Sequence, residues 1–564
     1  MRRSWPWGLS GPAVALIFLV VVGSVGRSSA CDGITDARLF LVPAADHPAN
    51  STRPIFDAPE SYPRYVGSAR GANNYQAVDG QQDSTPRGYI PQVPHTYALM
   101  EATYGVMNEH GVGIAESTCS CIDWSKIPSA AHLVGRAKPL MAIDTLSRIG
   151  LERATTARET VQIMGALAEA HGFYGPDSFE GTGETLLVED GNESFVFHIL
   201  GDPTGSSAVW VAQRVPDGHV AVCANLYIVR EVDLNDPSQF LYSQSMVSLA
   251  QEHGLWTPGT PFDFAGIYSD GEYAHKYYSG RRMWGAYHLL APSLNLNASY
   301  DNLLHDRPYP FSVRPDRLLN VSDFFRVHRY SYEDTPYSLR QGIAAGAFGT
   351  PDRYSGGAGE AEVQGNWERP ISLFRTTYSH VIQSHRDLPA AVRGTLFFGP
   401  HAAHGTCYLP LFSGQTEMAE AYRQARAGKL NRTSAFWAFR YVENLANLRF
   451  DAMIQDINAQ QRTYEAEGVA LRAQLVAAAQ AGHVDVANLT TASLALTQRV
   501  VAKWWELADD LMVKYADGWV TVNLGPVDAA APPGYPAWWL KQVGYPEGPP
   551  PVDAVHDNLD LGQK

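Results

Sequence analysis

The spacing of apolar and polar residues divides the chain into a helical stretch, a run of strands and a second, longer helical stretch. Apolar residues recur at helical spacing over 139–171, and an interruption near Ala154–Ala157 predicts two helices rather than one. Residues 185–229 show strand patterns separated by turn sequences such as Asp190-Gly191, with the last strand of the meander expected over Val220–Val229. Helices followed by adjacent antiparallel strands predict a layered α+β fold rather than alternating βαβ units.

Further elements are predicted on both sides of this region. Asn108-Glu109-His110-Gly111 has the composition of a hairpin turn between two apolar runs. Strands are expected over Ile371–Thr376 and Gly394–Phe398. From Ser434 to about Val513 the apolar stripe has helical period, and Gly482 near its middle predicts a turn between two long antiparallel helices.

Composition narrows the class of protein. The chain has 564 residues, 45% of them hydrophobic, and a net charge of −15, so it can bury a large core and offers no basic surface for nucleic acid. After the first thirty residues no apolar stretch is long enough for a membrane span. The expected organisation is a signal peptide over 1–30, a main domain over 31–430, a long helical hairpin packed on it over 431–520, and a Pro- and Trp-rich tail over 521–564.

The N-terminus resembles a secretory signal peptide. Two arginines precede an apolar stretch around Ala13–Val25, and the small residues Ser28 and Ala30 fit the positions before a signal peptidase cleavage site. Six Asn-x-Ser/Thr sequons follow, which favours a glycosylated protein that is secreted or resides in a lysosomal or vesicular lumen. The sequons begin at Asn50, Asn192, Asn297, Asn320, Asn431 and Asn488.

Cleavage after Ala30 would leave Cys31 as the first residue of the mature chain. Its thiol and a free α-amine would then share one residue, and that amine has a pKa suited to acting as a base near neutral pH. This pair is the catalytic centre of an N-terminal nucleophile hydrolase, although a half-cystine in the same place is equally compatible with the sequence. Five cysteines are too few for a disulfide scaffold, and Cys119-Ser120-Cys121 lacks the second pair that a zinc site needs.

An ordered set of motifs identifies a family resemblance covering roughly residues 36–550. The matching segments include Pro94-His95-Thr96-Tyr97, Met107–Ile114, Glu116-Ser117-Thr118, Leu151–Glu159, Trp210–Gly218, Ala224-Asn225, Arg369–Ser372, Gln383–Pro389 and Phe436-Trp437-Ala438-Phe439. In this set the chain resembles peptidase family C69, the dipeptidases related to secernins.

The resemblance implies an αββα N-terminal nucleophile sandwich, hydrolysis of dipeptides and no metal or organic cofactor. Catalysis would be carried by Cys31, with Asn225 as the amide that stabilises the oxyanion. Family members begin the mature chain with a Cys-Thr pair and a first hairpin, whereas Cys31 is followed here by Asp32-Gly33 and that hairpin is missing. Either Cys31 serves as the nucleophile and the segment that follows it is shortened, or the segment with the true nucleophile is missing from this sequence.

Three charged residues are candidates for binding a small peptide. Glu109 or Glu116 could pair with the substrate's ammonium group, and Arg214 could pair with its carboxylate, while structural roles remain open for all three. The leading hypothesis is therefore a cysteine-type dipeptidase. The alternatives are an N-acyl amide hydrolase of the bile-salt and penicillin-V amidase type, and an inactive secreted glycoprotein that keeps the fold.

Overall fold

An eight-stranded antiparallel sheet forms the centre of the molecule. The computed structural model describes residues 37–56, 82–175, 183–271, 273–306, 309–353, 368–426, 428–523, 525–531 and 534–548, with the backbone alone of Phe18–Leu19. The strands are ordered β14 (Phe240–Tyr242), β12 (Ala208–Arg214), β11 (Ser194–Gly201), β10 (Gly183–Glu189), β9 (Gly113–Cys119), β8 (Gly105–Asn108), β7 (Leu99–Glu101) and β2 (Phe40–Val42).

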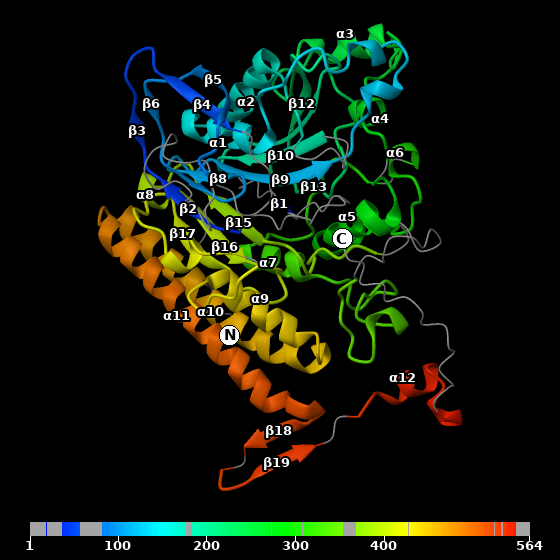
Figure 1. Ribbon diagram of the computed structural model, residues 1–564, viewed down its shortest axis with the longest axis vertical. Helices are drawn as coiled ribbons and strands as arrows, with labels where there is room; N and C mark the ends of the chain where they lie inside the picture. Colours follow the sequence, from blue (N-terminus) through cyan, green and yellow to red (C-terminus); the bar gives the residue numbers. More distant parts are fainter. Residues whose placement is uncertain are drawn as a thin grey trace, which may run out of the picture.

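Helices α1 (Ile143–Arg153) and α2 (Ala157–His171) cover one face of this sheet (Figure 1). Thr156 separates them, because its side chain caps α2 by accepting from the backbone N–H of Glu159. The apolar face of both helices packs against β9 to β12 in a continuous core. Gly165 lets α2 approach the sheet closely, since a Cβ there would lie 2.4 Å from the ring of Trp210.

A second, three-stranded sheet lies on the other side of the central sheet. It consists of β15 (Tyr378–Ser384), β16 (Gly394–Pro400) and β17 (Leu409–Phe412), all antiparallel. Helices α9 (Ala435–Ala446), α10 (Phe450–Gln480) and α11 (Val486–Tyr515) pack on its outer face. Along Figure 1 the order of layers is therefore α1 and α2, the large sheet, the small sheet, and α9 to α11. Gly482, with φ of 79°, forms the turn between α10 and α11, as the sequence predicted.

The remaining elements surround these layers. The strands are β1 (Phe18–Leu19), β3 (Ala45–Asp46), β4 (Thr52–Phe56), β5 (Pro86–Pro91), β6 (His95–Thr96), β13 (Val222–Cys223), β18 (Val520–Asn523) and β19 (Asp528–Ala531). The helices are α3 (Ser245–Glu252), α4 (Phe264–Tyr268), α5 (Arg281–Leu290), α6 (Leu303–Asp306), α7 (Val321–Arg329), α8 (Ala390–Arg393) and α12 (Ala537–Gln542).

Two predicted strands are wrong. Val220–Val229 does not complete the meander: it contains only the two-residue β13, and β14 takes the place beside β12. The run is interrupted at Asn225, whose left-handed φ of 56° a strand cannot contain. Ile371–Thr376 is likewise irregular, and the strand lies at β15 instead. The predicted strand over Gly394–Phe398 is confirmed as β16.

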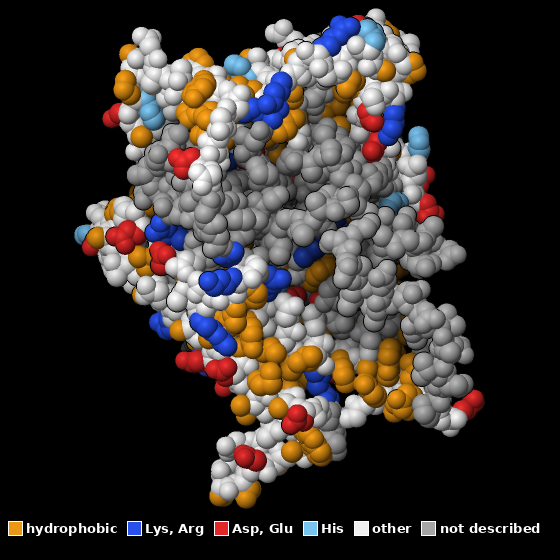
Figure 2. All heavy atoms as spheres, viewed as in Figure 1, with side chains coloured by type: hydrophobic (Ala, Val, Ile, Leu, Met, Phe, Trp, Pro, Cys, Tyr) orange, Lys and Arg blue, Asp and Glu red, His pale blue; other side chains and the backbone are white. Residues whose placement is uncertain are grey.

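The C-terminal segment is more regular than the tail expected from its prolines. It forms the hairpin β18–β19 and the short helix α12, which extend below the layers in Figure 1. Hydrophobic side chains gather over this lower part of the molecule in Figure 2. Val522 and Val527 are 47% and 62% exposed, so the hairpin has no core of its own. Among the described residues, no helix is long and apolar enough to cross a bilayer.

Candidate functional site

Asn225 is a buried residue in an unusual backbone conformation, two residues after the end of β13. Its side chain is fixed from both ends: Nδ2 donates to the backbone oxygen of Thr118 at 2.5 Å, and Oδ1 accepts from Nη1 of Arg282 at 2.9 Å. Its backbone N–H donates to Oγ of Ser117 at 2.9 Å. A non-glycine residue with positive φ costs free energy, so its retention at a buried polar position marks a functional-site candidate.

Arg282 holds the orientation of this amide. It is fully buried at the start of α5, which follows a single π-helical turn over Lys276–Gly280. Its Nε donates to the backbone oxygen of Tyr278 at 2.7 Å, and Nη2 donates to that of Ala224 at 3.3 Å. Because a guanidinium can only donate, its contact identifies the accepting atom of Asn225 as oxygen and leaves the NH₂ group as the donor end. Such a pre-oriented amide can stabilise a developing oxyanion.

A chain of buried polar groups supports the segment that follows Asn225. His198 accepts at Nε2 from the backbone N–H groups of Ile228 and Val229, at 2.9 and 3.2 Å. Its Nδ1 therefore carries the proton and donates to Oγ1 of Thr185 at 2.7 Å. Burial lowers the pKa of His198 to about 3, so the ring stays neutral. This histidine positions the loop rather than transferring protons.

The described cysteines are all buried. Cys119, Cys121, Cys223 and Cys407 form no disulfide bond among the described residues. Burial raises the pKa of the Cys119 thiol, whose Sγ lies 3.1 Å from Oγ1 of Thr185. Cys223 donates to the backbone oxygen of Leu226 at 3.2 Å and thereby stabilises the turn around Asn225. Their place in the structure is that of buried thiols.

Glu116 directly precedes Ser117, which contacts Asn225, but its own side chain lies on the other face of the sheet. Its neighbour Ser117 accepts from Asn225, and successive side chains of a strand point to opposite faces. The Glu116 carboxylate accepts from Oγ1 of Thr118 at 2.7 Å, and burial raises its pKa to about 7. It is 2% exposed, within the layer between the sheet and its two covering helices.

The structure does not bring Glu109 or Arg214 to Asn225. Glu109 accepts from the backbone N–H of Ala98 at 2.8 Å, in the turn between β8 and β9. Arg214 forms ion pairs with Glu193 at 3.2 Å and with Asp217 at 2.6 Å. Arg214 pairs with Phe195 on strand β11. Thr118, the partner of Asn225, is level in the sheet with Ile199 of the same strand, four residues further along. Four residues of strand span about 13 Å.

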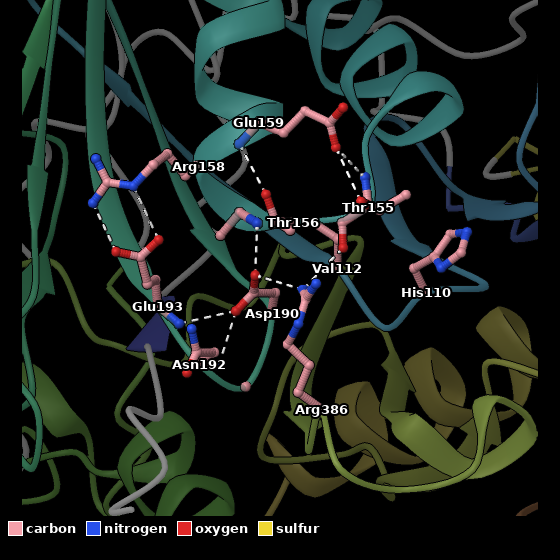
Figure 3. Close-up of polar contacts among 12 residues, drawn as sticks. His110, Val112, Thr155, Thr156, Arg158, Glu159, Asp190, Asn192, Glu193 and Arg386 are labelled. Carbon is pink, nitrogen blue, oxygen red and sulfur yellow. Dashed lines mark hydrogen bonds and ion pairs between the residues drawn. The ribbon is translucent and has the colours of Figure 1, made fainter.

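A polar cluster joins α2 to the two sheets near Arg214, at the end of the large sheet away from Asn225. Asp190 accepts from the backbone N–H of Ala157 and from Nη1 of Arg386, both at 3.0 Å (Figure 3). Arg158 forms a two-pronged pair with Glu193, at 3.1 and 2.7 Å. Asp190 is 2% exposed and sits at the N-terminus of α2, where a carboxylate is favoured. The cluster is a structural junction, since every guanidinium in it is already paired.

Cys31 lies outside the described residues. The nearest observation is that Phe18–Leu19 form strand β1, which pairs in parallel with β13, two residues before Asn225. The sequence did not identify Arg282 and Ser117 as partners of the site. Only the Arg281-Arg282 doublet gave any signal, because two adjacent guanidinium groups are rarely buried without an anionic or carbonyl partner.

Comparison with known proteins agrees with these features. The model of peptidase family C69 matches residues 49–463, more than half of the chain, so the protein belongs to peptidase family C69. A probable dipeptidase of Latilactobacillus sakei is 27% identical over 326 residues, covering 58% of this chain and 61% of that protein. Dipeptidase A of Lactobacillus helveticus is 25% identical over 243 residues, covering 43% and 46%. The aligned region thus spans less than two thirds of these relatives.

Proposed function

We propose that the protein is a cysteine-type dipeptidase that hydrolyses short peptides through an N-terminal Cys31. The observation that carries the proposal is the buried Asn225 amide, held in a left-handed backbone conformation and oriented by Arg282. Membership of peptidase family C69 and the dipeptidase names of its relatives support the same reaction. The order of layers, helices outside two stacked sheets, supports an N-terminal nucleophile sandwich.

The proposed mechanism uses only groups of the chain and water. The α-amine of Cys31 takes the thiol proton, and the thiolate attacks the scissile carbonyl. The oxyanion of the tetrahedral intermediate accepts from the Asn225 amide, whose orientation is set before the substrate arrives. The protonated amine then gives its proton to the leaving amino group. Water hydrolyses the thioester by the same route and regenerates the thiol.

Removal of residues 1–30 and passage through the secretory route are part of this proposal. Processing is what gives Cys31 its free amine. The sequon asparagines support a lumenal location, since Asn50, Asn192, Asn297, Asn320 and Asn488 are exposed and Asn431 is half-buried. Surface position is what an attached glycan requires.

The test combines the mature N-terminus with turnover. Mass spectrometry of the protein purified from its secreting cells should find an unblocked Cys31 as the first residue. That material should hydrolyse free dipeptides, lose activity on thiol alkylation, and lose it in Cys31→Ala but not in Cys407→Ala. A blocked amino group on the substrate should abolish turnover by a dipeptidase and spare turnover by an N-acyl amide hydrolase. An intact Cys31 terminus without any turnover would contradict the proposal.

One observation favours a second candidate, an inactive glycoprotein that keeps the fold. Strand β1 lies upstream of the proposed cleavage site yet pairs with β13 beside Asn225. A chain cleaved after Ala30 would lose this strand, whereas an uncleaved chain keeps it and has no free amine on Cys31. Detection of residues 18–19 in the mature protein would favour this candidate over the dipeptidase.

A further inference from the structure

The start of α5 places a second buried guanidinium beside the one that orients Asn225. Arg281 directly precedes Arg282 and is only 4% exposed. The two side chains have different partners: Arg282 reaches the Asn225 amide, while Arg281 stacks on the ring of Tyr337, with its Cζ 3.7 Å from the ring centroid. Stacking occupies the face of a guanidinium and leaves its N–H edge for in-plane partners.

The N–H edge of the Arg281 guanidinium has fewer acceptors than it has donors. Nε of Arg281 lies 3.1 Å from the Glu368 carboxylate, whose side chain is 21% exposed. Nη1 of Arg281 is buried and has no hydrogen-bond partner among the described residues. Oγ of Ser279, in the preceding π-helical turn, is also buried without a partner in the described structure. Buried donors are nearly always paired, so two orphans at one helix junction point to a ligand.

The missing partner is an anion with planar oxygens. A guanidinium edge matches a carboxylate in a two-pronged geometry, and a buried positive charge with spare donors gains most from a charged acceptor. Glu368 lies beside Nε of Arg281, which leaves Nη1 of the guanidinium available to another acceptor. A substrate carboxylate is therefore the ligand that completes the site.

We propose that Arg281 binds the C-terminal carboxylate of the substrate and so selects free dipeptides; this rests on the proposed function of Asn225 as the oxyanion donor. Arg281 is the chain neighbour of Arg282, which holds the Asn225 amide, so the proposed anchor lies on the same helical turn as the residue that orients the proposed oxyanion donor. A dipeptide carries its carboxylate one residue after the scissile carbonyl, whereas a longer peptide carries it further away.

The test measures binding separately from turnover. The probe is alanyl-alanine with its peptide bond reduced to a methylene amine, as the free acid and as the C-terminal amide, titrated calorimetrically into the full mature protein. The wild type should bind the acid on the order of 100-fold more tightly than the amide. Arg281→Gln should bind both about equally. Arg326→Gln, on the exposed side of α7, should behave as the wild type.

Each outcome decides the inference. A folded Arg281→Gln that keeps the wild-type preference for the acid overturns it, and so does a wild type without any preference. If Arg281→Gln does not fold, Arg281→Lys is used instead, because lysine keeps the positive charge but lacks the two parallel N–H donors of a guanidinium. An undiminished preference for the acid in Arg281→Lys also overturns the assignment. Preference for the acid without hydrolysis of ordinary alanyl-alanine would instead contradict the proposed function and leave the carboxylate site standing.

Discussion

Oδ1 of Asn225 accepts a hydrogen bond from Nη1 of Arg282 at 2.9 Å, although the two residues are 57 positions apart in the chain. The contact determines which end of the amide donates, and the left-handed backbone of Asn225 determines where it points. The first prediction separates these two properties.

Asn225→Gly should keep the fold and lose the reaction. Glycine adopts positive φ without strain, so the loss of stability should be limited to the side-chain hydrogen bonds with buried Arg282 and with Thr118, while loss of the oxyanion donor should lower kcat for a dipeptide by about 10²–10³. Asn225→Ala should lose the same activity and more stability, because alanine adds strain at positive φ. Asn295, exposed and with φ of 45°, offers the matched control, and Asn295→Gly should leave kcat unchanged. Full activity in folded Asn225→Gly would rule out the oxyanion role.

Asp190→Ala should be strongly destabilising. The carboxylate is buried and accepts from three backbone N–H groups and from Arg386, whose side chain is 40% exposed and also donates to the backbone oxygen of Thr155. Its removal leaves the three N–H groups without this acceptor, and we expect a loss of about 3 kcal/mol in the free energy of unfolding, measured by urea titration. Asp217→Ala removes an ion pair whose carboxylate is 59% exposed and should cost about 1 kcal/mol or less. Equal losses would contradict the structural role of Asp190.

Gly165→Ala tests how closely α2 packs on the sheet. Alanine favours a helix, yet its Cβ would lie 2.4 Å from Trp210, and overpacking of a close-packed core should outweigh the gain. The expected net loss is about 2 kcal/mol, seen as a lower Tm. Gln162→Ala, exposed on the same helix, should stay within about 0.5 kcal/mol of the wild type. A stabilised Gly165→Ala would show that the helix lies further from the sheet.

Stability should fall as pH rises from about 6.5 to 8. Burial raises the pKa of Glu116 to about 7 and of Glu189 to about 8, whereas the unfolded chain loses these protons near pH 4.5. The folded state therefore binds more protons across this interval, and each group lowers stability by about 1.4 kcal/mol for every pH unit until its folded pKa is passed.

Two buried histidines change stability in the opposite direction, but only below about pH 6.5. Burial lowers the pKa of His198 and of His401 to about 3, so their unfolded forms bind protons below about pH 6.5 and stability is lost as pH falls. Above pH 6.5 the carboxylates act without that compensation. Urea titrations at pH 6.5 and 8 should show a smaller difference for Glu189→Gln than for the wild type. The exposed Glu252→Gln should show the wild-type difference; an unchanged slope in Glu189→Gln would contradict the buried state of Glu189.

Local signals explain most of what the sequence could predict. The joint between α1 and α2 follows from the cap at Thr156, and the turn before β9 follows from Gly111, whose φ is 75°. Asn225 was identified as an oxyanion candidate through its resemblance to family members, but its backbone conformation was not foreseen. The Arg281-Arg282 doublet signals a buried charged pair, but nothing in the neighbouring sequence specifies a contact of Arg282 with a turn 57 residues earlier. The strand expected over Val220–Val229 failed for the same reason, since tertiary contacts of Asn225 override its apolar pattern.

The contacts of Asn225 also determine at which stage of synthesis its side-chain amide becomes oriented. Thr118 precedes Asn225 by 107 residues and Arg282 follows it by 57, so the ribosome must deliver three distant segments before the amide can be aimed. Pairings of such long separation form late, after the entropy of closing large loops has been overcome. A nascent or truncated chain that ends before Arg282 therefore carries Asn225 without the contact that orients its amide.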